Sequence, residues 1–494
     1  MMTFTTRNIA NVLALCFSIL LTFKAVQSKT TIELAPGTGF DKLSKSFNVF
    51  MFDADGVLWS GTSAIPGSAD FVNLLLYNKK KVYVISNGLR PIDAIHKKLN
   101  DWGFTVPEAE IKVITPGTIL PEMLLKVNGV NGKTVFLSGS DTVQKELEAK
   151  GLKVIGGGPY SKTYHTEVKA ACGRHLVVSM DADFDMVMAR DALSCLSSLP
   201  EMKVLVLKKA DVPKIGNNVH LGVESILAFF QATMPEERRL QPGGFEEPKT
   251  LAELLTKLKA QDTNALKQKG IHMVSTEKKP LGDFYTTPTL NPTPENIAAM
   301  VFSIDFEFSM KKARDMVTYL SKNENIAVMA TGGDHQMPPI SASKIGASNA
   351  IKKPVYPDVG GIVAFIRAAL PNHNKMKNLP VLGKPGQAVL EHLVAQDANS
   401  IENYKTLFIG DNLLTDIEFG NSFKGNTKKP GTKPTRGSEI TQPITTLLVG
   451  TGNHKMADVK SETNDLRVPV YFAASLESLL SAKNKQDLAA KKGK

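Results

Sequence analysis

Cysteine is scarce in this sequence, with three residues among 494. A small fold held together by many disulfides is therefore excluded, and stability has to come from a hydrophobic core. Cys16 lies in an N-terminal segment that we expect to be removed. Only Cys172 and Cys195 could then form a bond with each other, and the sequence does not determine whether they do.

Long apolar runs are also scarce, and no segment beyond the N-terminus is apolar enough to span a bilayer. The stretch from Ala10 to Phe23 follows Arg7 and precedes small and polar residues. This order is typical of a secretory signal peptide, here residues 1–28 with cleavage near Ser28. We expect a protein that is secreted or lies in the lumen of the secretory pathway, without stable membrane insertion. A membrane anchor formed by an uncleaved signal is the alternative.

The sequence lacks a clustered basic surface, although Lys and Arg number 59 against 48 Asp and Glu, a net charge of +11. The basic residues are scattered, apart from the C-terminal tail and residues 424–436. A nucleic-acid interface needs clustering with aromatic or motif support, so we expect no nucleic-acid partner. The charge instead favours attraction to anionic substrates or surfaces.

Short apolar segments alternate with helical stretches along much of the chain. "VFMF", "KKVYVISNG" and "KTVFLSGS" have the texture of buried strands, and "YKTLFIGDN" and "PITTLLVGTG" resume the pattern near the C-terminus. Strands that alternate with helices predict an α/β fold with a doubly wound parallel sheet. The length of 494 residues predicts two or three domains.

The middle of the chain contains an internal repeat. "VVSMDADFDMVMARDALSCLS" from Val177 aligns with "VFSIDFEFSMKKARDMVTYLS" from Val301. The match extends to "SILAFFQATMP" and "GIVAFIRAALP" downstream, and to "ELEAKGLKVI" and "ALKQKGIHMV" upstream. Two long copies predict a duplicated α/β module, because solenoid repeats are shorter and more numerous.

Two carboxylates, Asp53 and Asp55, follow the first predicted strand two positions apart. Taken alone, these two residues fit a simple Asp-Gly turn after the strand as well as they fit a functional site. In an open α/β sheet, however, residues at the carboxyl ends of strands face the ligand crevice. One carboxylate there could attack phosphorus, and the other could act as general acid and base. This chemistry needs a hard cation, and Mg²⁺ held by carboxylates is suited to it.

The hypothesis requires further polar groups at other strand ends: a hydroxyl and backbone amides for phosphate oxygens, a lysine for the transferred charge, and another acid for the metal. Each such residue alone is more typical of a turn or a surface, and it is their order after apolar strands that favours a phosphate site. The residues that meet the requirements are Ser86, Asn87 and Gly88 after the second strand, Lys384 in "VLGKPG", Asp411 after a later strand, and Asp416 one helical turn further on.

The segments "DADGVLW", "SNG", "GKPG" and "GDNLLTD" resemble the motifs of the haloacid dehalogenase-like hydrolases, and are most similar to the branch of 4-nitrophenylphosphatases and phosphoglycolate phosphatases. The resemblance implies a Mg²⁺-dependent phosphatase that hydrolyses small phosphorylated metabolites through an aspartyl-phosphate. Asp53 would be the nucleophile and Asp55 the general acid and base. Asp411 would bind Mg²⁺ together with the Asp53 carboxylate and the Asp55 backbone carbonyl. Asp416 would not bind the ion itself but would contact the residues that do.

In this family a large α/β cap lies between the second and third motifs, which is where the repeat is found. The resemblance therefore implies a core with an inserted, internally duplicated cap. Its expected parts are the core at 29–145 and, with a basic tail, at 381–494, and two cap copies at 146–263 and 264–380.

We expect the second copy to cover the active site, because it leads directly into Lys384 and keeps glycine-bearing turns next to Asp334 and His335. The first copy would pack beside it or mediate a homodimer through the cap. A mixed cap, with the opening strands of one copy and the closing strands of the other, is an alternative. Neither copy has the asparagine usual in the family, and Gly332 stands in its place in the second copy.

Two other functions stay open at this point. The chain could be a catalytically weak, phosphatase-like binding protein that uses the duplicated cap as an interaction surface, because fold does not guarantee function. It could also be a transferase that uses the same aspartyl-phosphate. The complete set of candidate residues favours the hydrolase over the binding protein, while the substrate and the oligomeric state are not determined by the sequence.

Overall fold

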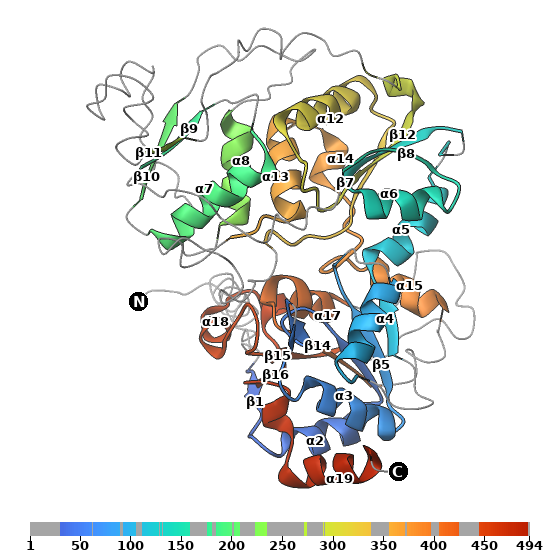
Figure 1. Ribbon diagram of the computed structural model, residues 1–494, viewed down its shortest axis with the longest axis vertical. Coiled ribbons are helices and arrows are strands. Elements are labelled where there is room, and N and C mark those ends of the chain that lie inside the picture. Colours follow the sequence, from blue (N-terminus) through green and yellow to red (C-terminus); the bar gives the residue numbers. More distant parts are fainter. Residues whose placement is uncertain are drawn as a thin grey trace, which may run out of the picture.

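The structure of the chain is a computed structural model with two lobes (Figure 1). The lower lobe contains a seven-stranded sheet, and the upper lobe contains a four-stranded and a three-stranded sheet. The residues that the structure describes are 30–61, 63–88, 92–104, 111–127, 129–130, 132–158, 175–179, 184–199, 202–207, 223–234, 271–273, 290, 292–336, 355–370, 373–396, 405–423 and 444–492.

The seven-stranded sheet is parallel throughout, as the alternation of strands and helices predicts. In order across the sheet, the strands are β1 (Ile32–Glu33), β16 (Tyr471–Ala473), β15 (Thr445–Val449), β14 (Thr406–Gly410), β2 (Val49–Phe52), β5 (Lys81–Ile85) and β6 (Ile111–Ile114). The strand order reverses at β2. The strands that follow β2 in the sequence, β5 and β6, lie on one side of it, and the C-terminal strands β14, β15 and β16 lie on the other.

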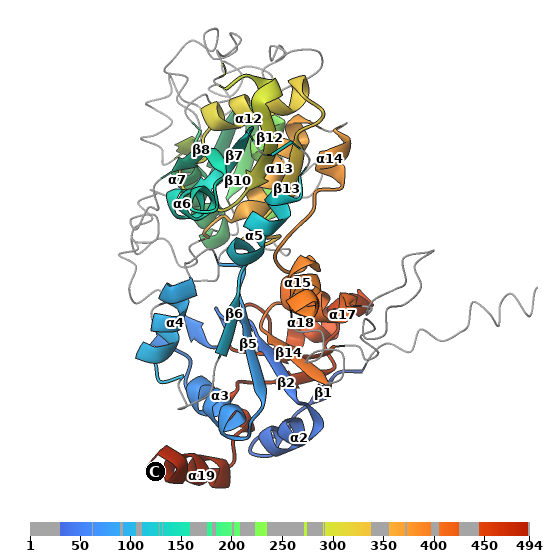
Figure 2. The same cartoon turned by 90° about the vertical axis from the view of Figure 1, so that its right-hand side faces the viewer.

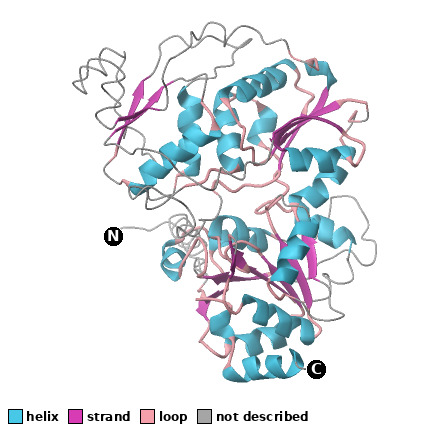
Figure 3. Ribbon diagram, viewed as in Figure 1, coloured by secondary structure: helices cyan, strands magenta, loops and turns pink. Residues whose placement is uncertain are grey.

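Strand β2 is buried on both faces, which explains why its sequence is apolar without alternation. Phe50 and Phe52 pack into the core on one face, whereas Val49 and Met51 pack into the core on the other. Helices lie on both sides of the sheet (Figures 2 and 3). The helices of this lobe are α2 (Gly39–Ser46), α3 (Ser68–Tyr77), α4 (Ile92–Asp101), α15 (Ala388–Gln396), α17 (Glu418–Ser422), α18 (Met456–Ser461) and α19 (Ala482–Lys492), and α5 (Pro116–Leu125) lies at the junction with the upper lobe.

The upper lobe is an insertion into this core, and both of its sheets are parallel. The four-stranded sheet has the order β13 (Ala327–Ala330), β12 (Ile297–Phe302), β7 (Thr134–Ser140) and β8 (Lys153–Gly158). The three-stranded sheet has the order β10 (Lys203–Leu207), β9 (His175–Ser179) and β11 (Ile271–Met273). The principal helices are α6 (Asp141–Glu148), α7 (Met186–Ser198), α8 (Val223–Thr233), α12 (Met310–Lys322) and α13 (Val359–Ala369).

The two repeat copies contribute elements in the same order to this lobe. The first copy supplies β9, α7, β10 and α8, and the second supplies β12, α12, β13 and α13. The sheets are nevertheless mixed. β8, from the expected unit 146–263, shares a sheet with β12, and β11, from the expected unit 264–380, pairs with β9. The first strand of each expected unit, β8 or β11, thus lies in the sheet formed by the later strands of the other unit. The two expected units are therefore not separate modules.

One boundary is corrected by the strand pairing. We expected the first part of the core to extend to residue 145, but β7 pairs with β12 and β8 in the upper lobe. The first core segment therefore ends before β7. A buried strand has the same apolar texture in either lobe, so the sequence of β7 does not show which sheet it joins.

In the part of the chain that the structure describes, no helix combines the length and the apolar character that crossing a membrane requires. The expected signal peptide, residues 1–28, lies outside that part, as do Cys16 and Cys172. Cys195, on α7, is disulfide-bonded and its side chain is completely buried.

Candidate active site

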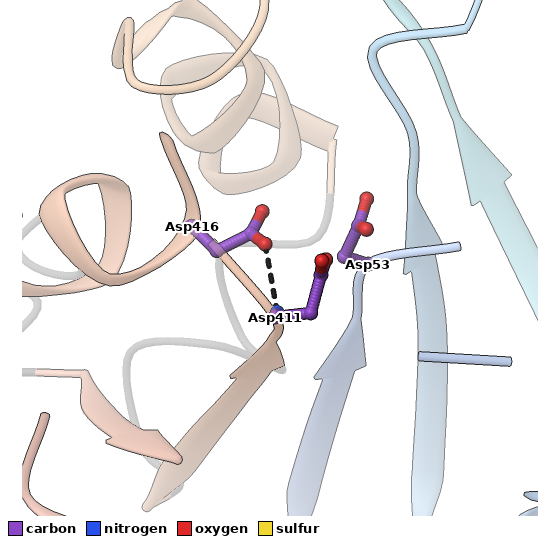
Figure 4. Close-up of side chains that lie close together, drawn as sticks. All are labelled: Asp53, Asp411 and Asp416. Atoms are coloured by element: carbon purple, nitrogen blue, oxygen red, sulfur yellow. Dashed lines mark hydrogen bonds between the residues drawn. The ribbon is translucent and has the colours of Figure 1, made fainter. Parts of the chain in front are cut away.

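Three neighbouring strands bring the expected site residues to one edge of the seven-stranded sheet. Asp53 follows β2, Ser86 follows β5 and Asp411 follows β14. Because β2 lies between β14 and β5 and all three run parallel, their carboxyl ends open at the same edge. Figure 4 shows Asp53 and Asp411 directly beyond the ends of two adjacent strands.

The carboxylates of Asp53, Asp411 and Asp416 converge at this edge (Figure 4). Each offers an oxygen, and these oxygens all lie within 4.8 Å of one another. The residues are only 8%, 1% and 1% exposed. Asp416, expected to act from behind the metal ligands, is thus part of the cluster itself. The carboxylate of Asp55 does not belong to it.

The ammonium group of Lys384 lies against this cluster. It forms one ion pair with Asp53 and another, at 2.7 Å, with Asp416. Lys384 is 2% exposed, so all four charged groups are shielded from bulk water. With every group ionised, three carboxylates and one ammonium leave two negative charges uncompensated. Buried charge of this kind is strongly unfavourable unless it is paired, so the arrangement calls for a divalent cation or proton uptake.

The pKa values in the cluster move in the direction that this imbalance predicts. Burial raises the pKa of Asp411 to about 7, and the nearby Asp416 carboxylate adds to the rise. Burial also raises the pKa of Asp53 well above its usual value, opposed by Lys384 and reinforced by Asp416 and Asp411. Burial alone would lower the pKa of Lys384, but Asp416 and Asp53 outweigh it and raise that pKa. A bound dication would favour the ionised carboxylates instead.

Asp416 holds both the turn after β14 and the lysine. Its Oδ2 accepts hydrogen bonds from the backbone N–H groups of Asp411, at 3.0 Å, and Asn412, at 3.1 Å. Its Oδ1 accepts from Lys384. A single π-helical turn, Leu413–Ile417, directs the Asp416 side chain back towards the end of the strand. Such a wide turn is a frequent feature of functional sites.

Asn453 belongs to the site, although the sequence analysis did not identify it. Its backbone N–H and its side-chain amide both donate to Oδ2 of Asp411, at 2.6 and 2.9 Å. Because both bonds go to the same oxygen, Asn453 fixes the orientation of the Asp411 carboxylate. Asn453 follows β15 in "LLVGTGN", so the rule that selected polar residues after other strands could have found it.

The turn after β2 separates the roles of Asp53 and Asp55. Asp55 is half-buried and its backbone pairs with Trp59, which places it outside the carboxylate cluster. Gly56 follows with φ +90°, and a Cβ there would lie 2.6 Å from the Asp411 carboxylate. Only glycine allows both this conformation and this approach. Its carbonyl accepts a 2.6 Å hydrogen bond from Thr451, which ties the turn to the loop after β15.

The residues of "SNG" do not all behave alike. Ser86 is buried directly after β5, and its Oγ accepts a 3.1 Å hydrogen bond from the backbone N–H of Gly88. Asn87 uses both ends of its amide on other groups: its Oδ1 accepts from the N–H of Lys384, and its Nδ2 donates to Lys384 and Asp334. Asn87, expected to bind substrate, is therefore placed to position Lys384 instead.

The second repeat copy reaches the site through two acids. Asp334, after β13, accepts a 2.6 Å hydrogen bond from Asn87, and Asp358 caps the start of α13 beside it. Burial raises the pKa of Asp334 to about 6. Burial and the Asp334 carboxylate together raise the pKa of Asp358 to about 7. The end of β13 and the start of α13 therefore lie next to the core and present carboxyl groups to it, and β13 belongs to a sheet that also contains β8 of the first unit, as in the mixed cap.

Known proteins are similar to part of this chain. The family model described as haloacid dehalogenase-like hydrolase matches residues 50–153. A putative NipSnap protein of Caenorhabditis elegans is 34% identical over 26% of this chain and 25% of its own length. A 4-nitrophenylphosphatase of Schizosaccharomyces pombe is 33% identical over 25% of this chain and 42% of its own. A phosphoglycolate phosphatase of Arabidopsis thaliana is 31% identical over 24% of this chain and 32% of its own.

Among solved structures, a 4-nitrophenylphosphatase from Thermotoga maritima aligns with 88% of this chain and 97% of its own, at 16% identity and a TM-score of 0.45. The chain spans between a quarter and about two-fifths of the length of the three curated relatives named above. The matched segment, residues 50–153, includes β2 with Asp53 and β5 with Ser86. Residues 50–153 thus match the haloacid dehalogenase-like hydrolases, and Asp53 and Ser86 lie at strand ends within the matched segment.

Proposed function

We propose that the chain is a Mg²⁺-dependent phosphatase that hydrolyses small phosphomonoesters through an aspartyl-phosphate on Asp53. The observation that carries the proposal is the buried group of Asp53, Asp411 and Asp416 against Lys384 at the carboxyl edge of the sheet. It joins a carboxylate nucleophile, a fixed positive charge and a set of metal-binding oxygens in one place. Relatives named as 4-nitrophenyl phosphate, phosphoglycolate and glycerol-3-phosphate phosphatases give the proposal further support.

The chemistry of the cluster fits Mg²⁺. The donors are carboxylate oxygens, which Mg²⁺ prefers, and the two uncompensated charges match a dication. Asp53 and Asp411 would hold the ion, with Asp416 close by. Asn453 would hold the Asp411 carboxylate in a fixed orientation through its two bonds to Oδ2. When bound, Mg²⁺ would offset the repulsion between the nucleophile and an anionic phosphate.

The side chains of the chain itself supply the remaining steps. A carboxylate oxygen of Asp53 attacks phosphorus, the bond from phosphorus to the ester oxygen breaks, and Asp55 donates a proton to the departing oxygen. Asp55 then takes a proton from water while the water oxygen attacks phosphorus. Inorganic phosphate leaves and the Asp53 carboxylate is regenerated. Lys384 and the hydroxyl of Ser86 would hold phosphate oxygens during both transfers.

The upper lobe limits which esters reach the site. It contributes Asp334, which accepts a hydrogen bond from Asn87, and Asp358 beside it. A cap over the crevice would exclude bulk water from the reaction. We infer that leaving groups with hydroxyls or a neutral ring are accepted more readily than leaving groups with a carboxylate. Glycerol 3-phosphate and 4-nitrophenyl phosphate are therefore better candidate substrates than phosphoglycolate.

The proposed location is the lumen of the secretory pathway or the extracellular space. The order of residues 1–28 supports it, and so does the disulfide bond of Cys195, since such bonds persist in oxidising compartments. Comparison of the mature N-terminus with the encoded one, by mass spectrometry of secreted protein, tests both cleavage and export. A retained N-terminus on membrane-bound protein would favour the anchored alternative.

Turnover of 4-nitrophenyl phosphate by purified residues 29–494 tests the activity, with Asp53→Asn as the matched inactive variant. Mg²⁺-dependent release of phosphate that the variant lacks is the expected result. If the wild type is no faster than Asp53→Asn, the binding-protein alternative is favoured instead. If phosphate passes to added alcohols rather than to water, the transferase is favoured.

A further inference from the structure

The two repeat copies meet through the same pair of positions on each. Asp185 of the first copy and Ser309 of the second form an antiparallel bridge. The N–H of Met186 donates to the carbonyl of Phe308 at 3.0 Å, and the N–H of Met310 donates to the carbonyl of Phe184 at 2.8 Å. These are aligned positions in the repeat. The same position donates a hydrogen bond in each copy, and the same position accepts one in the other copy. Such reciprocal contacts are characteristic of a two-fold interface.

Aromatic side chains repeat this reciprocity. Phe184 stacks on Phe365 with ring centroids 6.0 Å apart and an interplanar angle of 13°. Phe308 stacks on Phe229 at 6.4 Å and 10°. Phe184 aligns with Phe308 in the repeat, and Phe229 aligns with Phe365. The two stacked pairs are thus the same contact made twice, once in each direction.

Helices α8 and α13 form the centre of the interface. They are aligned elements of the two copies, and they pack directly on each other between the two sheets of the upper lobe (Figure 1). A Cβ on Gly361 of α13 would lie 3.0 Å from the ring of Phe229 on α8, so the helices approach closely there. One continuous hydrophobic core includes residues of both copies, and Phe184, Phe229, Phe308 and Phe365 are completely buried in it.

Among the residues that the structure describes, the second copy makes direct contacts with the catalytic core. Asp334 accepts the hydrogen bond from Asn87, and Ala330 at the end of β13 pairs with Val381, three residues before Lys384. Apolar residues of α13 pack on α8 of the first copy, in one core that both copies share. Without the first copy these residues would form an exposed apolar patch, of the kind that usually marks an interface with another surface.

We propose that the upper lobe is a cap dimer built within one chain. The first copy occupies the face of the second that a partner subunit would otherwise cover, and its role is to stabilise the cap rather than to contact substrate. The chain then works as a monomer with one active site. The homodimer through the cap, which the sequence allowed, is replaced by this internal contact. The inference goes beyond the proposed phosphatase activity and does not depend on it.

The first measurement is the mass of purified residues 29–494 by sedimentation equilibrium, over about a hundredfold range of concentration. The expected result is the mass of one chain throughout. A mass of two chains would overturn the proposal, because the cap would then still need a partner. This experiment requires no variant and no substrate.

The second measurement compares the two stacked pairs by double-mutant cycles in denaturant unfolding. Phe184→Leu with Phe365→Leu, and Phe308→Leu with Phe229→Leu, should both be non-additive, with similar shifts in midpoint. Phe40→Leu, in the lower lobe, should be additive with Phe365→Leu. Coupling in one pair but not in the other would overturn the two-fold relation. Leucine preserves apolar volume, and the sedimentation test stands if a variant does not fold.

Discussion

The side chain of Asn87 holds both backbone groups of Lys384. Its Oδ1 accepts a hydrogen bond from the N–H of Lys384 at 2.8 Å, and its Nδ2 donates to the carbonyl of the same residue at 2.9 Å. The remaining donor of the amide goes to Asp334 in the upper lobe, at 2.6 Å. One side chain thus fixes the lysine that contacts Asp53 and connects it to the cap. The role of Asn87 is therefore to position Lys384.

Replacement of Asn87 by alanine should therefore lower kcat more than it raises KM. The lysine keeps its charge but loses the two bonds that fix its backbone, and small displacements of a positioned group cost up to about 10²-fold in rate. We expect a loss of roughly 10- to 100-fold in kcat. Asn100→Ala, on the exposed side of α4, is the matched control. A rise in KM at unchanged kcat would show that Asn87 binds substrate directly.

Replacement of Asp53 by asparagine should abolish turnover while the fold persists. The amide is nearly isosteric with the carboxylate but is a poor nucleophile, and the loss should be on the order of 10³-fold or more. Phosphate release and the thermal unfolding midpoint are the two measurements, with the exposed Asp93→Asn as control. Activity close to wild type in Asp53→Asn would exclude the aspartyl-phosphate mechanism.

Removal of divalent cations should silence the enzyme, and Mg²⁺ should restore it. Ca²⁺ should restore little activity, because its longer and looser coordination would displace the phosphate relative to Asp53. Asp411→Asn should raise the Mg²⁺ concentration for half-maximal activity by at least about 10-fold. Activity titrations against Mg²⁺ measure this shift. Full activity in excess chelator would contradict the metal role of Asp411.

Replacement of Asp358 by asparagine should relax discrimination against anionic leaving groups. The substitution removes one of the two carboxyl groups that the upper lobe presents to the site. We expect kcat/KM for phosphoglycolate to rise by roughly 10-fold relative to glycerol 3-phosphate. Turnover of 4-nitrophenyl phosphate, whose leaving group has no carboxylate, serves as the internal control. If the ratio stays constant, these acids do not select the leaving group.

The same residue should make stability depend on pH. Burial raises the pKa of Asp358 to about 7, whereas an aspartate in an unfolded chain titrates near about 3.9. The folded chain thus keeps a proton that the unfolded chain has released, so stability falls as pH rises from about 4 through about 7. Asp358→Asn cannot ionise and should lose less stability than the wild type over this window. Denaturant midpoints at several pH values measure the difference, and parallel curves would contradict it.

Much of the core and of the site followed from the sequence. Apolar runs followed by acids predicted β2 and β14 with Asp53 and Asp411 at their ends, because a strand buried on both faces needs an unbroken apolar run. Residues at strand ends then share one edge whatever the distance between them in the chain. Lys384 could be chosen for the same reason, and the repeat was visible as matched residues.

Tertiary structure decided what depends on pairing between distant segments. β7 has the texture of a core strand, and only its bonds with β12 place it in the upper lobe. Asn87 follows Ser86 like a phosphate ligand, but the backbone of Lys384, 297 residues away, takes its amide. Asp416 lies in the carboxylate cluster because residues Leu413–Ile417 form a π-helical turn, which their amino-acid types do not predict. Local sequence sets which residues can be buried, whereas the partner of each buried polar group is set by whichever distant segment the fold brings beside it.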